Sequence, residues 1–207
     1  MSGTIDYYFT LVSPWAYIGH AAFTAVARKH GAKIVCKPVN LGEVFPQSGG
    51  LPLPKRHPLR LAYRIMELQR WREKRGLKFA LAPKGWPFNP ALADCAALAI
   101  IADGRDPEAY LLAAFRAAFE KEISLGEAEN VARVLQESGH KDAGALIDAA
   151  QSPGMLAAYE ANSRAALENG VFGSPSYVRE GEVFWGQDRI DLLDDALTSG
   201  RKPYLAD

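Results

Sequence analysis

Residues 5–20, I-D-Y-Y-F-T-L-V-S-P-W-A-Y-I-G-H, determine the fold that we expect for this chain. Residues 5–10 are rich in aromatic and β-branched side chains, which favour a β-strand. Ser13 follows as a helix N-cap, and Pro14 fits the first helical position, where its missing N–H is not needed. The sequence therefore predicts a strand that brings a serine hydroxyl to the electropositive end of a helix, where anions and thiolates are stabilised.

The composition is that of an ordinary globular protein. The chain has 207 residues, of which 48% are hydrophobic and 23% are charged, and 24 Lys and Arg residues balance 24 Asp and Glu residues. This length allows a large core, and the balanced charge gives no general attraction to nucleic acid or to a membrane surface. The most apolar stretch, residues 96–102, is far shorter than the ~20 residues of a membrane-spanning helix. We therefore expect no nucleic-acid partner and no membrane partner.

The cysteine content argues against metal binding and disulfide bonding. Only Cys36 and Cys95 occur, and they are far apart in the sequence. Neither has the spacing to another ligand that a metal site needs, so we predict no metal ion and no disulfide framework. The N-terminus also lacks a basic segment followed by an apolar run, which a secretory signal requires. These features predict a cytoplasmic protein.

The remaining segments alternate between strand and helix patterns. A second strand is predicted at residues 33–39, and residues 42–58 are expected to form a long loop because they are rich in Gly and Pro. Helices are then predicted, in order, at residues 59–75, 91–102, 107–122, 127–138, 141–150 and 153–169. A hairpin with strands at 176–179 and 182–185 follows, and a last helix at 188–197 is expected to begin with Asp188 as its N-cap.

This order predicts an α/β protein: a thioredoxin-like fold with a large all-helical domain inserted after the N-terminal βαβ unit. We assign residues 1–41 and 152–207 to the thioredoxin-like domain and residues 42–151 to the inserted helical domain. In a redox thioredoxin fold, a C-x-x-C pair opens the first helix, but here that position holds Ser13-Pro14-Trp15-Ala16. The sequence argues against disulfide exchange by this chain, because that reaction requires a protein thiolate.

Four motifs stand in order along nearly the whole chain: Y-Y-F-T-L-V-S-P-W-A-Y at 7–17, E-L-Q-R-W at 67–71, V-F-G-S-P at 171–175 and V-F-W-G-Q-D-R-I at 183–190. Together they resemble the 2-hydroxychromene-2-carboxylate isomerases, of the kappa-class glutathione transferase and DsbA-like superfamily. The resemblance implies a glutathione-dependent enzyme, typically a homodimer. Its reaction interconverts 2-hydroxychromene-2-carboxylate and trans-o-hydroxybenzylidenepyruvate, a step in the catabolism of aromatic compounds such as naphthalene.

The resemblance implies that Ser13 contacts the sulfur of glutathione. The Ser13 hydroxyl would donate to the sulfur, and the helix N-terminus would add its field, so that both favour the thiolate. The alternative is a plain helix N-cap. Ser174 and Pro175 match a turn with a cis proline, whose backbone would pair with the cysteinyl part of glutathione. The alternative for Pro175 is an ordinary loop proline, because few X-Pro bonds are cis.

The two ends of glutathione are assigned to other segments by the same resemblance. Gln187 and Asp188 match the segment that holds the γ-glutamyl end, and the Asp188 carboxylate can pair with its ammonium. Capping alone is the alternative for Asp188. Arg60 stands where related sequences carry a Lys near the glycyl carboxylate, and the two side chains place their charge differently. Arg60 is otherwise part of a solvated basic helix face.

Trp86 and Asn89, in the loop before the inserted helices, are the expected contacts to a small aromatic substrate. The Asn89 amide would hydrogen-bond the substrate's oxygens, whereas packing in the core is the commoner fate of a Trp side chain. The mechanism implied is reversible addition of the glutathione thiolate to the substrate. Two alternatives stay open: a kappa-class-like glutathione transferase or peroxidase, and a non-catalytic thioredoxin-like binding module.

Overall fold

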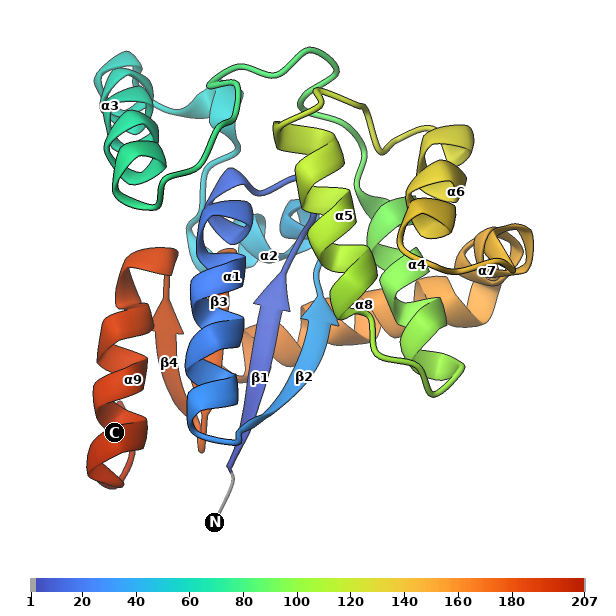
Figure 1. Ribbon diagram of the computed structural model, residues 1–207. Coiled ribbons are helices and arrows are strands. Elements are labelled where there is room, and N and C mark those ends of the chain that lie inside the picture. The colour runs from blue at the N-terminus through green and yellow to red at the C-terminus, as the bar shows by residue number, and fades with distance from the viewer. Residues whose placement is uncertain (1–2, 207) are drawn as a thin grey trace.

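A mixed four-stranded sheet forms the centre of the computed structural model, which describes residues 3–206 (Figure 1). Its strands are β1 (Thr4–Phe9), β2 (Lys33–Pro38), β3 (Ser176–Arg179) and β4 (Glu182–Trp185), in the order β2-β1-β3-β4. β1 and β2 are parallel, whereas β3 is antiparallel to both of its neighbours. The predicted βαβ unit and hairpin are thereby confirmed. Met1, Ser2 and Asp207, which we assigned to the thioredoxin-like domain, lie outside the described residues.

Helices cover both faces of this sheet. On one face, the Tyr7 ring lies 4.8 Å from the ring of Phe23 on α1 (Pro14–Lys29) and 5.5 Å from that of Tyr177. On the other face, Tyr8 packs in a separate apolar cluster with Val44 of α2 (Leu41–Ser48) and Ala166 of α8 (Pro153–Glu168). Successive side chains of a strand point to opposite faces, so one aromatic run in β1 supplies both cores. The last helix, α9 (Ile190–Ser199), lies beside α1 (Figure 1).

Most of the helical insertion lies beside the sheet on the β2 side, whereas its first long helix lies on the opposite side, above β4 and α9 (Figure 1). It contains α3 (Pro58–Lys74), α4 (Ala91–Ala102), α5 (Glu108–Phe119), α6 (Ala128–Glu137) and α7 (Ala143–Ala150). α5 packs on α1, with the rings of Tyr17 and Phe119 stacked at 5.1 Å, and α4 packs against α8 and β2. The predicted fold class is confirmed, a thioredoxin-like α/β fold with a helical insertion. The division into domains 1–41 with 152–207 and 42–151 stays a prediction. The two parts share one buried cluster of hydrophobic side chains.

The predicted loop at residues 42–58 is wrong in part. The segment contains most of helix α2 and a 3-10 turn, η1 (Leu53–Lys55). Asn40 caps α2, its side-chain oxygen accepting from the Gly42 N–H at 2.9 Å, and Val44 is buried against the sheet. This cap and this burial stabilise a short helix in spite of Pro46 inside it.

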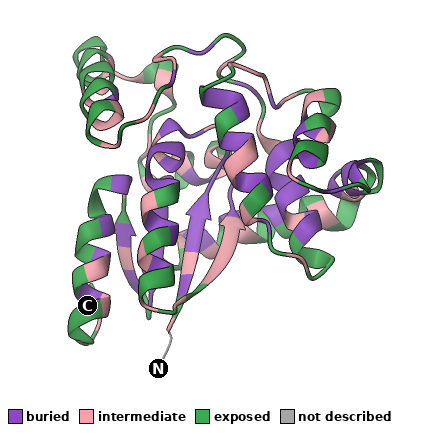
Figure 2. Cartoon of the chain, viewed as in Figure 1, coloured by how far each residue is buried: buried purple, intermediate pink, exposed green. Residues whose placement is uncertain are grey.

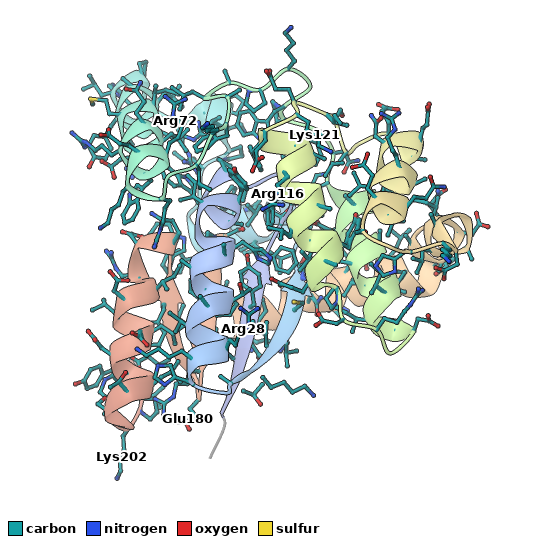
Figure 3. All side chains as sticks on the ribbon, in the orientation of Figure 1. Arg28, Arg72, Arg116, Lys121, Glu180 and Lys202 are labelled. Carbon is teal, nitrogen blue, oxygen red and sulfur yellow. The ribbon has the colours of Figure 1, made fainter. Side chains whose placement is uncertain are left out.

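Helix α3 differs from the other long helices in its packing. It stands away from the sheet, and most of its surface is exposed (Figures 1 and 2). Leu68 is its one buried residue, and Arg72, labelled in Figure 3, donates from Nη1 to the Phe79 carbonyl at 3.0 Å. Within residues 3–206, no helix combines the length and the apolar character needed to cross a membrane.

Candidate functional site

Ser13 caps the N-terminus of α1, as the sequence predicts. Its Oγ accepts from the Ala16 N–H at 3.2 Å, and Pro14 occupies the first helical position. The same hydroxyl donates to the carbonyl oxygen of Ser174 at 3.1 Å, across 161 residues of chain. Ser13 is 6% exposed, so its hydroxyl lies just beneath the surface at the electropositive end of a sixteen-residue helix.

The turn before β3 meets the Ser13 loop. The Ser174–Pro175 bond is cis, which confirms that part of the sequence-based expectation. Ser174 Oγ accepts from the Thr10 N–H at 3.2 Å, while the Pro175 carbonyl accepts from the Gly186 N–H at 2.9 Å. The turn is therefore joined to the loop after β1 on one side and to the loop after β4 on the other. A carbonyl oxygen has two lone pairs, so Ser174 retains one acceptor site beyond its bond to Ser13.

Gln187 and Asp188 belong to a 3-10 turn, η2 (Gln187–Arg189), which precedes α9. The expectation that Asp188 caps the last helix is wrong, because Arg189 occupies the N-cap of α9. Gly186 has φ +98°, a conformation open mainly to glycine, and this turns the chain one step before the helix begins. Asp188 is exposed and its carboxylate is 2.6 Å from Arg189 Nη1. Gln187 is 2% exposed and faces α1 instead of solvent.

Trp86 lies next to the Ser13 loop. Its indole Nε1 donates to the Val12 carbonyl at 2.8 Å, one residue before Ser13. The Arg64 guanidinium lies 5.2 Å from the centre of the indole ring, which is a cation–π arrangement. Pro14, Arg64 and Trp86 line a narrow crevice at the start of α1, too narrow in this structure to hold a water molecule. The structure thus brings Ser13, Ser174, Pro175 and Trp86 together.

Arg60 and Asn89 do not contact this group. Arg60 is exposed on α3, and no described carboxylate lies within ion-pair distance of it. Asn89 is exposed, and its side-chain oxygen accepts from the Ala91 N–H at 3.1 Å at the start of α4. This bond closes a turn just before α4, whose N-cap is Pro90.

Sequence reasoning missed three charged residues near these segments. Arg64 was given no role by the sequence analysis, although it is half-buried over Trp86. Arg75 reaches the 3-10 turn, with Nη2 3.4 Å from the side-chain oxygen of Gln187. Asp94, on α4, is fully buried and bonds to the Thr10–Leu11 loop. The contacts Arg75–Gln187 and Thr10–Asp94 join residues separated by 112 and 84 positions, so no local pattern could have revealed them.

The protein's own thiols do not replace the missing C-x-x-C pair. Burial is the largest cause that raises the pKa of both Cys36 and Cys95 to about 12, so neither forms a thiolate at neutral pH. A groove of about 770 Å³ lies elsewhere, between β4, α9 and the C-terminal segment, and Ser13 does not line it. The chemistry of this arrangement is that of a preformed hydrogen-bond donor and a helix N-terminus, which together stabilise an anion supplied from outside.

Residues 4–198 match the DSBA-like thioredoxin domain family. The chain belongs to this family. Since the match spans both strand regions and the whole insertion, the family covers the thioredoxin-like part and the helices together.

Three relatives that are 24–29% identical over nearly the whole chain are named isomerases. The 2-hydroxychromene-2-carboxylate isomerase of Sphingobium xenophagum is 29% identical over 199 residues, which cover 95% of this chain and 99% of the relative. A solved 2-hydroxychromene-2-carboxylate isomerase superposes with a TM-score of 0.83 at 24% identity, with 95% of each chain covered. The glutathione-bound cytosolic disulfide reductase DsbM of Pseudomonas aeruginosa superposes with a TM-score of 0.68 at 19% identity, with 95% of this chain and 96% of DsbM covered. The latter two likenesses show the shared fold.

Proposed function

We propose that this protein is a glutathione-dependent isomerase that interconverts 2-hydroxychromene-2-carboxylate and trans-o-hydroxybenzylidenepyruvate. The observation that carries the proposal is the position of Ser13: a serine hydroxyl at the N-terminus of α1, bonded at 3.1 Å to the residue before a cis proline. The isomerase relatives, similar over nearly their full length, support this substrate class. Glutathione supplies, when bound, a thiolate that adds reversibly to the substrate so that a constrained bond can rotate.

The residues present fit glutathione, whose polar groups are a thiol, two carboxylates, an ammonium and peptide amides. For the sulfur, Ser13 would turn its hydroxyl from the Ser174 carbonyl and donate to the thiolate, while the N-terminus of α1 favours the negative charge. The freed Ser174 carbonyl would then accept from the cysteinyl N–H. For Ser13 this change would be a rotation of the hydroxyl, whose oxygen would keep its bond from the Ala16 N–H.

The charged ends of glutathione would meet opposite charges around this centre. Asp188 is exposed and would bind the ammonium, with the backbone of Gln187 beside it. Arg60 has no described carboxylate partner within ion-pair distance and would bind the glycyl carboxylate. Arg64 is likewise without a described carboxylate partner, and desolvation followed by the charge of Arg56 lowers its pKa. Arg64, which lines the crevice with Pro14, therefore leaves positive charge uncompensated near Ser13, which suits anionic ligands.

The aromatic substrate would lie against Trp86, next to the Ser13 loop. The Arg64 guanidinium lies over the face of this indole ring, and the carboxylate of the substrate would bind to it. Asn89 would hydrogen-bond a substrate oxygen after leaving its bond to the Ala91 N–H. The crevice must widen for the substrate to enter, and α3 is the element best suited to move because it has only one buried residue.

The proposal is tested by following 2-hydroxychromene-2-carboxylate by absorbance, with and without glutathione. We expect turnover only when glutathione is present, and we expect calorimetric titration to show that glutathione binds. Equal turnover without glutathione would contradict the proposed cofactor. Binding of glutathione with conjugation of a chlorodinitrobenzene-type electrophile, and no isomerisation, would favour a transferase. No binding at millimolar glutathione would favour a non-catalytic module.

The proposal includes a homodimer and a cytoplasmic location, as the family resemblance and the sequence suggest. Light scattering coupled to size-exclusion chromatography tests the first, and the expected mass is twice the 22.6 kDa of one chain. A mass of one chain at micromolar concentration would contradict the dimer.

A further inference from the structure

A fully buried carboxylate joins the helical insertion to the loop that carries Ser13. Asp94 lies in the first turn of α4 and is 0% exposed. Its Oδ1 accepts from the Leu11 N–H at 2.9 Å, and its Oδ2 accepts from the Thr10 hydroxyl at 2.7 Å. The Tyr159 hydroxyl of α8 also donates to Oδ2, at 2.9 Å. Three donors from two separate segments therefore converge on one side chain.

The Thr10–Leu11 loop that Asp94 holds is connected directly to the candidate site. The Ser13 N–H donates to the Thr10 carbonyl at 3.0 Å, which sets the entry of the chain into α1. The Thr10 N–H donates to Ser174 Oγ at 3.2 Å, and Ser13 Oγ donates to the Ser174 carbonyl. The hydrogen bonds thus run without a break from Asp94 through Thr10 to Ser13 and Ser174. Two of the links are made by the backbone of Thr10, so a shift of this residue would move both serines.

The donors around Asp94 suit the ionised carboxylate. An ionised carboxylate only accepts hydrogen bonds, and all three neighbours donate. No described Lys, Arg or His forms an ion pair with Asp94. The titratable groups that face it are Tyr159 of α8, Tyr110 of α5, Tyr7 of β1 and its neighbour Cys95. Each of them is uncharged at neutral pH, because its pKa is raised, so hydrogen bonds alone stabilise the carboxylate.

We propose that Asp94 is a positioning residue: its carboxylate fixes the Thr10–Leu11 loop and thereby holds the Ser13 hydroxyl and the Ser174 turn in register. This inference rests on the proposed function only for the role of Ser13 in the reaction. The coupling between Asp94 and the loop is a property of the protein without any ligand.

A consequence of this arrangement is that the Thr10–Leu11 loop responds to pH. Desolvation is the largest cause that raises the pKa of Asp94 to about 7, against the bonds from Thr10, Leu11 and Tyr159, which lower it. Protonation adds a hydrogen to one carboxylate oxygen, so at least one of the three neighbours can no longer donate there unchanged. The hydrogen bonds from the loop and from Tyr159 are therefore complete only above about pH 7, although the whole fold is then less stable, because an ionised carboxylate is buried. Removing the hydrogen bond from Tyr159 would shift the pKa of Asp94 without changing any residue of the loop.

The first test measures the backbone amide resonances of Leu11 and Ser13 by NMR between pH 5.5 and 8.5, without glutathione. The wild type is compared with Asp94→Asn, with Tyr159→Phe, and with Asp148→Asn as a control for an exposed carboxylate of the insertion. We expect both resonances to shift with a midpoint near 7 in the wild type and in the control. The midpoint should rise in Tyr159→Phe and vanish in Asp94→Asn. A titration that persists in Asp94→Asn, or that is absent from the wild type, would overturn the proposal.

The second test measures kcat for isomerisation at saturating glutathione. Asp94→Asn should lose at least tenfold in kcat and lose the wild-type change in rate near pH 7, whereas Asp148→Asn should retain both. A folded Asp94→Asn protein with unchanged kcat and pH profile would overturn the proposal. If Asp94→Asn does not fold, the amide titration of Tyr159→Phe decides. A midpoint equal to that of the wild type would overturn the proposal. If the wild type binds no glutathione, the proposed function fails, while the amide titration still decides the role of Asp94.

Discussion

The hydroxyl of Ser13 donates to the carbonyl oxygen of Ser174 at 3.1 Å and so joins the start of α1 to the cis-proline turn. The two residues are 161 positions apart, yet each carries a feature that the sequence predicts, the helix cap and the cis bond. In the function that we propose, this contact keeps a hydrogen-bond donor ready for the glutathione thiolate.

Ser13 has a matched control within the same chain. Ser152-Pro153 opens α8 as Ser13-Pro14 opens α1, and the Ser152 Oγ accepts from the Met155 N–H at 3.2 Å. Replacing either serine by alanine removes one N-cap and should lower the free energy of unfolding by about 0.5–2 kcal/mol. Urea unfolding measures this loss. Only Ser13→Ala should abolish isomerisation, and equal activity in the two variants would show that Ser13 merely caps the helix.

Arg64 should determine affinity for the anionic substrate. A hydrogen bond to a charged group contributes about 1.5–3 kcal/mol, so Arg64→Gln should raise the KM for 2-hydroxychromene-2-carboxylate about tenfold or more. Arg70→Gln is the control, because Arg70 lies on the same helix but is already paired with Glu67. Steady-state kinetics at low ionic strength measures both variants. An equal effect of the two substitutions would indicate only a general loss of positive charge.

Gly19 allows α1 to approach the 3-10 turn closely. A Cβ placed on Gly19 would lie 2.6 Å from the Gln187 Cβ and 3.0 Å from the Tyr177 hydroxyl. Gly19→Ala should therefore destabilise the protein by about 1–3 kcal/mol through overpacking, and it should weaken glutathione binding by displacing Gln187. Gly144→Ala, in an open position of α7, should be neutral or stabilising by up to ~1 kcal/mol. Equal unfolding free energies in the two variants would contradict this close packing.

Asp94 should make the free energy of unfolding fall as pH rises, whereas a carboxylate paired with a cation makes it rise. Its pKa in the folded protein, about 7, is higher than in the unfolded chain, so folding takes up a proton between these two values. Its contribution to stability is thus lost as pH rises from about 4 to 7 and is constant above. The difference in unfolding free energy between wild type and Asp94→Asn should fall by up to about 1.4 kcal/mol per pH unit in this range. Urea unfolding at several pH values measures it, and a difference independent of pH would contradict the raised pKa.

Local patterns predicted most of the fold. The run of aromatic and β-branched residues in β1 and the Ser-Pro starts of α1 and α8 depend on neighbouring residues, and the structure has each of them. Residues 42–58 were misjudged because Pro46 and the glycines are strong local breakers. What stabilises α2 is burial of Val44 against the sheet, a tertiary effect that local propensity does not contain.

The site was predicted less completely than the fold. The contact of Ser13 with the Ser174 turn follows from the fold class, and the bond from Trp86 to Val12 puts the expected substrate residue next to it. Arg75 and Asp94 escaped notice because their partners are distant in sequence. Asp94 stands in a helix of mostly apolar residues, and a carboxylate at such a position was the one available sign of a buried role.

The most direct test of the central claim is the thiol pKa of bound glutathione, measured by the ultraviolet absorbance of the thiolate as a function of pH. Wild type, Ser13→Ala and Ser152→Ala are compared, each saturated with glutathione. We expect the thiol pKa of bound glutathione to lie below that of free glutathione in the wild type and in Ser152→Ala. Ser13→Ala should still bind, with a thiol pKa higher by about 1–2 units, as the loss of a hydrogen bond to a charged group implies. Identical thiol pKa values in all three proteins would contradict the central claim.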